Sequence, residues 1–180
     1  MADCFSPYNI RKSEYLNIEA VIMLNVLILC TGNSCRSVLG EALINHLGQG
    51  RLRAFSAGSR PVGKVNANAL ATLQRNGLPT EGYSSQSWDE FADAGIDIAI
   101  TVCDQAAGEV CPVYLDSTTR AHWGLPDPAH ASGTEAEVQA AFQATYEALE
   151  RRVKAMLALP LETLSCAELS AKLNYIGQSC

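Results

Sequence analysis

The chain has no hydrophobic run long enough to cross a membrane and no excess of basic residues. Its longest mainly apolar stretch, residues 20–30, is interrupted by Asn25 and falls short of the roughly 20 residues that a membrane helix requires. The formal net charge is -6, whereas a nonspecific nucleic-acid binder presents an excess of positive charge. We therefore expect neither a membrane nor a nucleic acid among the partners.

Signals for secretion and for zinc binding are also missing. Residues 1–22 mix acidic and basic side chains and lack a positive start, an apolar core and a cleavage site in that order. The three histidines are scattered and no Cys-x-x-Cys pair occurs, so we assign no metal ligands. Seven cysteines at irregular spacing and without a signal peptide are typical of reactive thiols in a reducing compartment. We expect that compartment to be the cytoplasm.

A length of 180 residues fits one well-filled domain. Residues 1–22 have no clear periodicity, and we expect them to be an N-terminal extension whose order the sequence leaves open. The domain itself is expected over residues 23–180.

Segments with strand and helix character alternate along this domain. The pattern predicts strands over residues 24–29, 52–56, 96–102 and about 120–123. It predicts helices over residues 37–47, around Leu70 and Leu73 with a stop at Gly77, from a capping box at Thr134 through Met156, and from a second capping box at Ser165. Such an alternation indicates an α/β fold whose parallel sheet is covered on both faces.

Three chemically active residues follow different predicted strands. Cys30 ends the first strand, Cys103 follows the third, and Asp127 comes after the fourth. Ligands of parallel sheets collect at the carboxyl ends of the strands. We therefore expect these residues to meet at one edge.

The segment from Cys30 to Ser37 has the composition of an anion-binding loop. It lies between a strand and a helix, where backbone N–H groups can turn toward one point. Arg36 offers a planar fork for two oxygens, Gly32 permits unusual backbone angles and Asn33 tolerates left-handed ones. We expect the positive surroundings to lower the pKa of Cys30. The predicted oxyanion-binding residues are Thr31, Gly32, Asn33, Ser34, Cys35, Arg36 and Ser37. Because Cys-x5-Arg also arises by chance, Cys30 could instead be a simple buried cysteine, but the flanking strand and helix favour function.

These residues resemble the low-molecular-weight tyrosine phosphatase superfamily, which includes the thiol-dependent arsenate reductases, over about residues 24–157. The resemblance implies a three-layer α/β fold with a four-stranded parallel sheet flanked by helices. It implies that the domain is catalytic, with Cys30 as nucleophile, Arg36 as oxyanion ligand and Asp127 as general acid. The alternative for Asp127 is a turn residue before Pro128.

Two further cysteines favour a reductase over a phosphatase. In the resembling reductases a second cysteine releases arsenite from the thiol-arsenate adduct, and a third captures the disulfide. The resemblance assigns these steps to Cys30, Cys103 and Cys111, with arsenate as substrate and no tightly bound cofactor. It also implies an external thiol reductant, either thioredoxin or glutaredoxin with glutathione. The Cys-x7-Cys spacing leaves the donor open, and both cysteines could instead fill the core.

Other readings of the same residues stay open. Ala129 and His130 stand where phosphatases usually carry tyrosines, yet a low-molecular-weight protein tyrosine phosphatase is the main alternative. A noncatalytic arsenate or redox sensor is another. The resemblance also raises a potassium site at Asn33, Glu41 and Ser56, with an aspartate near Asp89. Cys35 could protect Cys30 by forming a disulfide or be a packed thiol.

Overall fold

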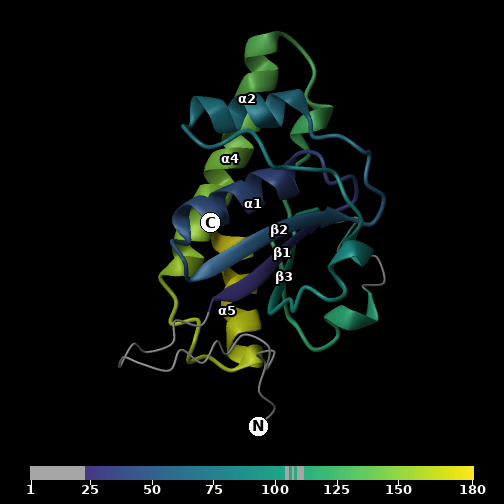
Figure 1. Cartoon of the computed structure of the whole chain (residues 1–180). Helices are drawn as coiled ribbons and strands as arrows, with labels where there is room; N and C mark the ends of the chain where they lie inside the picture. Colours follow the sequence, from purple (N-terminus) through teal and green to yellow (C-terminus); the bar gives the residue numbers. More distant parts are fainter. Residues whose placement is uncertain (1–22, 104–105, 107, 109–111) are drawn as a thin grey trace, which may run out of the picture.

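The computed structural model describes residues 23–180 except 104, 105, 107 and 109–111. Within these residues the strands are β1 (Leu24–Cys30), β2 (Leu52–Gly58), β3 (Ile98–Thr101) and β4 (Thr119–His122) (Figure 1). The helices are α1 (Arg36–Leu47), α2 (Ala67–Arg75), α4 (Glu135–Leu157) and α5 (Cys166–Ser179), with short 3-10 helices η2 (Trp88–Phe91), η3 (Val113–Leu115) and η4 (Pro128–His130). The predictions for residues 1–22 and for Cys111 concern parts outside this description.

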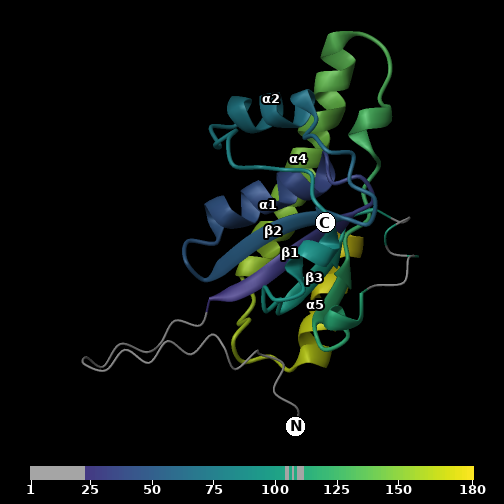
Figure 2. The same ribbon diagram turned by 45° about the vertical axis from the view of Figure 1, so that its right-hand side comes forward.

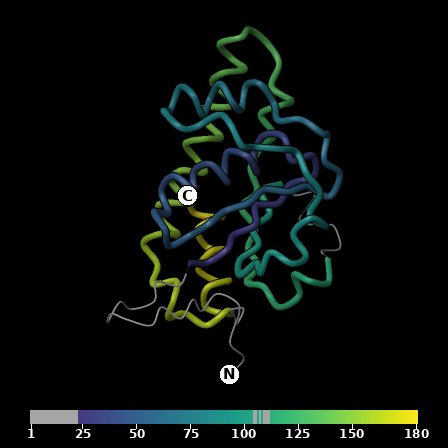
Figure 3. The backbone as a smooth tube through the Cα atoms, viewed as in Figure 1, coloured from purple at the N-terminus to yellow at the C-terminus, as the bar shows by residue number. Residues whose placement is uncertain are grey.

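All four strands are parallel, in the order β2-β1-β3-β4. Every residue of β1 is buried, as expected for a strand covered on both faces. The strand that follows β1 in the chain, β2, pairs with one edge of β1, and the next strand, β3, pairs with the opposite edge of β1. The carboxyl end of β1 is therefore a switch point of the sheet, where ligand sites form in open α/β folds. Figure 3 traces these crossovers along the backbone.

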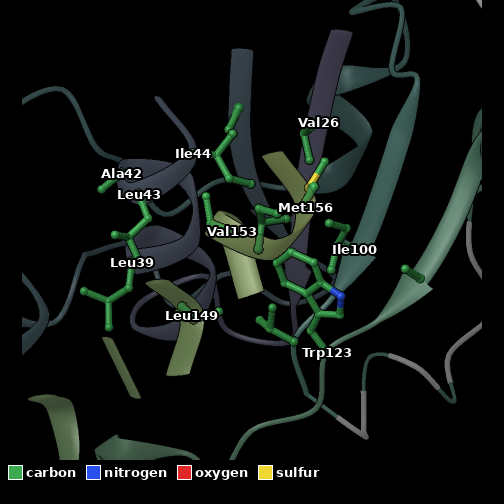
Figure 4. Close-up of a cluster of buried hydrophobic side chains, with 14 of the residues drawn as sticks. Val26, Leu39, Ala42, Leu43, Ile44, Ile100, Trp123, Leu149, Val153 and Met156 are labelled. Carbon is green, nitrogen blue, oxygen red and sulfur yellow. The ribbon is translucent and has the colours of Figure 1, made fainter. Parts of the chain in front are cut away.

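The two faces of the sheet carry different covers. Val26 and Ile28 belong to the larger core cluster, which also contains buried residues of α1, α2, α4 and α5. Leu27 and Leu29 point to the other face, where Phe91 of η2 and other residues of η2 and η3 pack. Figure 2 shows this arrangement of helices about the sheet. In Figure 4, side chains of α1 and α4 meet those of the strands in the larger cluster.

The predicted elements are largely confirmed, and their bounds differ in places. The third strand is shorter than the predicted residues 96–102, and just before its start the Asp97 carboxylate accepts the backbone N–H of Asn25 at 2.8 Å. The helices α4 and α5 begin at the predicted capping boxes, with Thr134 and Ser165 as N-caps. Among the described residues, no helix is long and apolar enough to span a membrane.

Candidate active site

The loop between β1 and α1 wraps around the sulfur of Cys30. The backbone N–H of Asn33 donates to Cys30 Sγ at 3.1 Å, and the Ser37 hydroxyl lies 3.0 Å from the same sulfur. Asn33 has a φ of 45°, a left-handed conformation that asparagine tolerates well. The left-handed position is thus Asn33, as its tolerance of such angles allows, whereas Gly32, which would permit unusual angles, has no positive φ.

The carbonyl groups of this loop point outward. They accept hydrogen bonds from the segment after β2, in the pairs Ser59 N to Cys30 O, Arg60 N to Thr31 O, Val62 N to Gly32 O and Asn66 N to Ser34 O. Among the described side chains, none caps α1, whose N-cap residue is Cys35. Loop and first-turn N–H groups are therefore left to bind a tetrahedral anion at a helix N-terminus.

The side-chain amide of Asn33 determines which atoms donate in the hydrogen bonds that link Ser56, Ser37 and the sulfur of Cys30. Its Oδ1 accepts the backbone N–H of Gln86 at 2.7 Å, so its Nδ2 faces the hydroxyls of Ser37 and Ser56 at 3.0 and 2.9 Å. Because Ser37 Oγ accepts from Asn33, its own proton is free for the sulfur of Cys30. All three side chains, Asn33, Ser37 and Ser56, are buried.

The pKa of Cys30 does not follow the prediction. Burial raises it above its ordinary value, while the hydroxyl of Ser37 and the N–H of Asn33 lower it and the Cys103 thiol raises it. The expected net lowering is therefore wrong for this arrangement of side chains. The physical reason for the raised pKa is desolvation of the thiolate. The guanidinium of Arg36 does not offset it, because it binds Leu125 O and Asp127 instead.

Arg36 binds the segment that carries Asp127. Its Nη2 lies 2.6 Å from Asp127 Oδ2, and its Nη1 donates to the carbonyl oxygen of Leu125 at 2.8 Å. Asp127 also accepts the backbone N–H of Ala129 at 3.0 Å, as the N-cap of η4. The structure thus brings the predicted arginine and acid together at the loop.

Cys103 also reaches the loop. Its Sγ lies 3.6 Å from Thr31 Oγ1 and accepts the backbone N–H of Ala106 at 3.3 Å. The thiol is buried, and Cys111 lies outside the described residues.

Cys35 is, after Cys30, the second buried free thiol of the oxyanion loop, and burial raises its pKa to about 11.

The residues considered for potassium do not form an open cage of oxygens. Asn33 turns its nitrogen, not its oxygen, toward Ser56, and the Ser56 hydroxyl donates to Glu41 Oε2 at 2.6 Å. Asp89 is exposed and accepts the hydroxyl of Ser87. The polar atoms of Asn33, Ser56 and Glu41 thus bond to one another, whereas Asp89 bonds to Ser87, and the potassium site stays a prediction. Burial raises the pKa of Glu41 to about 7.

Sequence reasoning missed two features of the site. Gly58 ends β2 directly against the loop, and its only sequence signal is a glycine after a buried strand. A pocket of about 460 Å³ lies beside Asp127, between the segment 125–131 and α4. Its lining is mainly apolar and includes Leu125, Pro126, Pro128, His130, Ala141 and Thr145.

Comparisons with known proteins agree with this geometry. The family of low molecular weight phosphotyrosine protein phosphatases matches residues 25–172. An arsenate reductase of Bacillus licheniformis is 37% identical over 130 residues, which cover 72% of this chain and 91% of that protein. A solved arsenate reductase in the phosphate binding state is 27% identical with a TM-score of 0.65, covering 76% of this chain and 98% of the other.

A solved tyrosine phosphatase from Escherichia coli K30, in complex with sulphate, is also similar. It is 25% identical with a TM-score of 0.59, and the match covers 74% of this chain and 95% of the other. Both kinds of enzyme thus share the fold found here. Given the family match across most of its length, the chain belongs to the low molecular weight phosphotyrosine protein phosphatase family.

Proposed function

We propose that the chain is a cytoplasmic arsenate reductase that uses a relay of Cys30, Cys103 and Cys111. The observation that carries the proposal is the approach of a second thiol to the oxyanion loop, with Cys103 Sγ 3.6 Å from Thr31 Oγ1. A phosphatase needs one nucleophilic cysteine, because water attacks its intermediate. A reductase must supply two electrons, and two thiols that join in a disulfide supply them.

The first step makes a bond between sulfur and arsenic. Arsenate enters the loop, and Arg36 leaves Asp127 to bind two of its oxygens. The Cys30 thiolate attacks arsenic. The Asp127 carboxylate takes up a proton from solvent beside the bound anion once Arg36 has left it, and it gives that proton to one arsenate oxygen, which departs as water. Ser37 is placed to donate to the sulfur at 3.0 Å and so to stabilise the thiolate against its burial. Arsenic remains As(V) in the adduct.

The second step transfers the electrons. The Cys103 thiolate attacks the sulfur of Cys30, a disulfide forms between them, and the sulfur-arsenic bond breaks with its electron pair going to arsenic. Arsenic leaves as As(III), in arsenite. Cys111 then attacks Cys103, which frees Cys30 as a thiolate and leaves a Cys103–Cys111 disulfide. An external thiol reductant, either thioredoxin or glutaredoxin with glutathione, supplies two electrons and reduces that disulfide.

A phosphatase is the second candidate, and the pocket beside Asp127 is the observation that favours it. Its volume of about 460 Å³ is within the usual range for small-ligand sites, and Asp127 stands in its lining. The aryl group of a phosphate ester could lie there while Asp127 protonates the leaving oxygen. This reaction would need Cys30 but neither Cys103 nor Cys111.

Turnover assays separate the two candidates. Arsenite formation from arsenate would be measured with a thioredoxin system and, separately, with a glutaredoxin and glutathione system. We expect one of them to sustain turnover in the unsubstituted chain, and Cys30→Ser, Cys103→Ser and Cys111→Ser each to abolish it. Cys180→Ser, which changes an exposed free thiol, is the control. Hydrolysis of an aryl phosphate that survives Cys103→Ser, without arsenite formation from either donor, would identify a phosphatase instead.

A further inference from the structure

Arg152 is a buried arginine on α4, and two of its three hydrogen-bond acceptors lie just ahead of the proposed acid in the chain. It is 5% exposed, and its Nη1 donates to the carbonyl oxygens of Trp123 at 2.9 Å and Gly124 at 3.4 Å. Its Nε donates to the main-chain oxygen of Cys180 at 3.2 Å. Desolvating a guanidinium is costly, so a buried arginine requires well-placed acceptors. Two of these acceptors belong to the segment that joins β4 to Asp127.

Arg36 holds the next part of the same segment. It binds the carbonyl oxygen of Leu125 and the carboxylate of Asp127. Two arginines, from α1 and α4, therefore bind acceptors spread over residues 123–127. Only Arg36 can reach a bound anion, because it belongs to the oxyanion loop, whereas Arg152 is buried in the core.

An oxyanion in the loop competes for only one of these arginines. When the Arg36 fork turns to the anion, Leu125 O and the Asp127 carboxylate lose its hydrogen bonds. We propose that Arg152 is the positioning residue that then keeps the segment 123–127 in place, so that Asp127 stays beside the anion. This inference rests on the proposed function for the role of Asp127 as the acid. The backbone N–H of Leu125 also donates to the carbonyl oxygen of Val102, just after β3, at 3.2 Å.

A purely structural role for Arg152 is the competing account. In that case replacing Arg152 would lower the stability of the fold. In the molecules that remain folded, Asp127 would stand at the same place beside a bound anion. Binding of inorganic phosphate to the reduced protein, measured by calorimetry, separates the two accounts. Phosphate binding requires no electron transfer, so its result does not depend on whether the chain reduces arsenate.

The experiment compares the effect of Asp127→Asn in different backgrounds. In the unsubstituted chain, Asp127→Asn should tighten phosphate binding severalfold, because it removes a like charge and a competitor for Arg36. In the Arg152→Met background the same change should tighten binding by less, because the carboxylate no longer stands beside the bound anion and only its competition for Arg36 in the anion-free protein remains. Arg151→Met, a change of the exposed neighbouring arginine, should retain the full effect.

Three results would overturn the inference. The first is an Asp127→Asn effect of equal size in the unsubstituted and Arg152→Met backgrounds, and the second is no effect of Asp127→Asn in the unsubstituted chain. If Arg152→Met does not fold, Arg152→Lys replaces it, because an ammonium keeps the charge but lacks the planar fork that reaches several carbonyls. Arg152→Lys should then give an intermediate effect, and a full effect there is the third contrary result.

Discussion

Gly58 lies so close to the carbonyl oxygen of Thr31 that a Cβ atom at Gly58 would stand 2.5 Å from that oxygen. The same Cβ would be 3.1 Å from the backbone nitrogen of Asn33. Both neighbours belong to the oxyanion loop and cannot move without changing its shape. The end of β2 thus sets how tightly the loop can fold over Cys30.

Gly58→Ala should disturb the loop more than Gly32→Ala does. A Cβ at Gly32 would meet only Val62 Cγ1, at the ordinary contact distance of 3.4 Å. We expect Gly58→Ala to destabilise the fold by about 1–3 kcal/mol, as overpacking does, and to weaken phosphate binding at least tenfold. Thermal unfolding and calorimetry check both effects. Equal Tm values for the two variants would contradict this account of Gly58.

Ser37→Ala should raise the pKa of Cys30 further. The hydroxyl of Ser37 is the largest of the influences that lower this pKa, whereas burial raises it. Alanine has no hydroxyl, so the effect of burial is no longer offset by this hydrogen bond. The rate of alkylation by iodoacetamide, followed against pH, reports the thiolate fraction. The midpoint for Cys30 should move to higher pH in Ser37→Ala and stay in Ser34→Ala, whose hydroxyl lies near the sulfur of Cys35. A midpoint unchanged by Ser37→Ala would mean that its hydroxyl does not stabilise the thiolate.

The convergence of Cys30, Cys103 and the Asp127 segment could be predicted because it follows from simple rules. Parallel strands bring their carboxyl ends to one edge, and short apolar runs rich in β-branched residues locate the strands well. The capping boxes at Thr134 and Ser165 likewise gave correct helix starts, since their signal is confined to four neighbouring residues.

Features that depend on distant partners could not be read from the sequence. Gln86 orients the Asn33 amide from a loop that comes 53 residues later, and no local pattern indicates this pairing. The pKa of Cys30 depends on burial and on where Arg36 points, and both are properties of the folded chain. Arg152 looked like one more charged residue on a helix, although its position in the core makes it unusual.

Arg36→Lys should weaken oxyanion binding although it keeps the positive charge. An ammonium cannot contact two oxygens through a planar fork, nor hold Leu125 O and the Asp127 carboxylate together as Arg36 does. Loss of one strong charge-assisted bond predicts a Kd for phosphate roughly 10- to 100-fold higher. Arg53→Lys, on an exposed position of β2, is the matched control. Unchanged phosphate affinity in Arg36→Lys would remove Arg36 from the anion site.

The stability of the protein should depend on pH through Glu41. Burial raises its pKa in the folded chain from 4.5 to about 7, so the fold favours the protonated carboxyl. The stability gained from this preference is fully present below pH 4.5 and is lost as the pH rises through 7. A difference of this size corresponds to an upper limit of roughly 3 kcal/mol.

Glu41→Gln removes this titration while keeping the shape of the side chain. The variant should become more stable relative to the unsubstituted chain as the pH rises from 5 to 8, by about 1–3 kcal/mol in urea unfolding. Glu147→Gln, a change on the exposed side of α4, should follow the unsubstituted chain at every pH. If the difference between Glu41→Gln and the unsubstituted chain stays constant over this range, then Glu41 is ionised throughout. Its carboxylate would then be stabilised by Ser56, whose hydroxyl bond would outweigh the cost of burial.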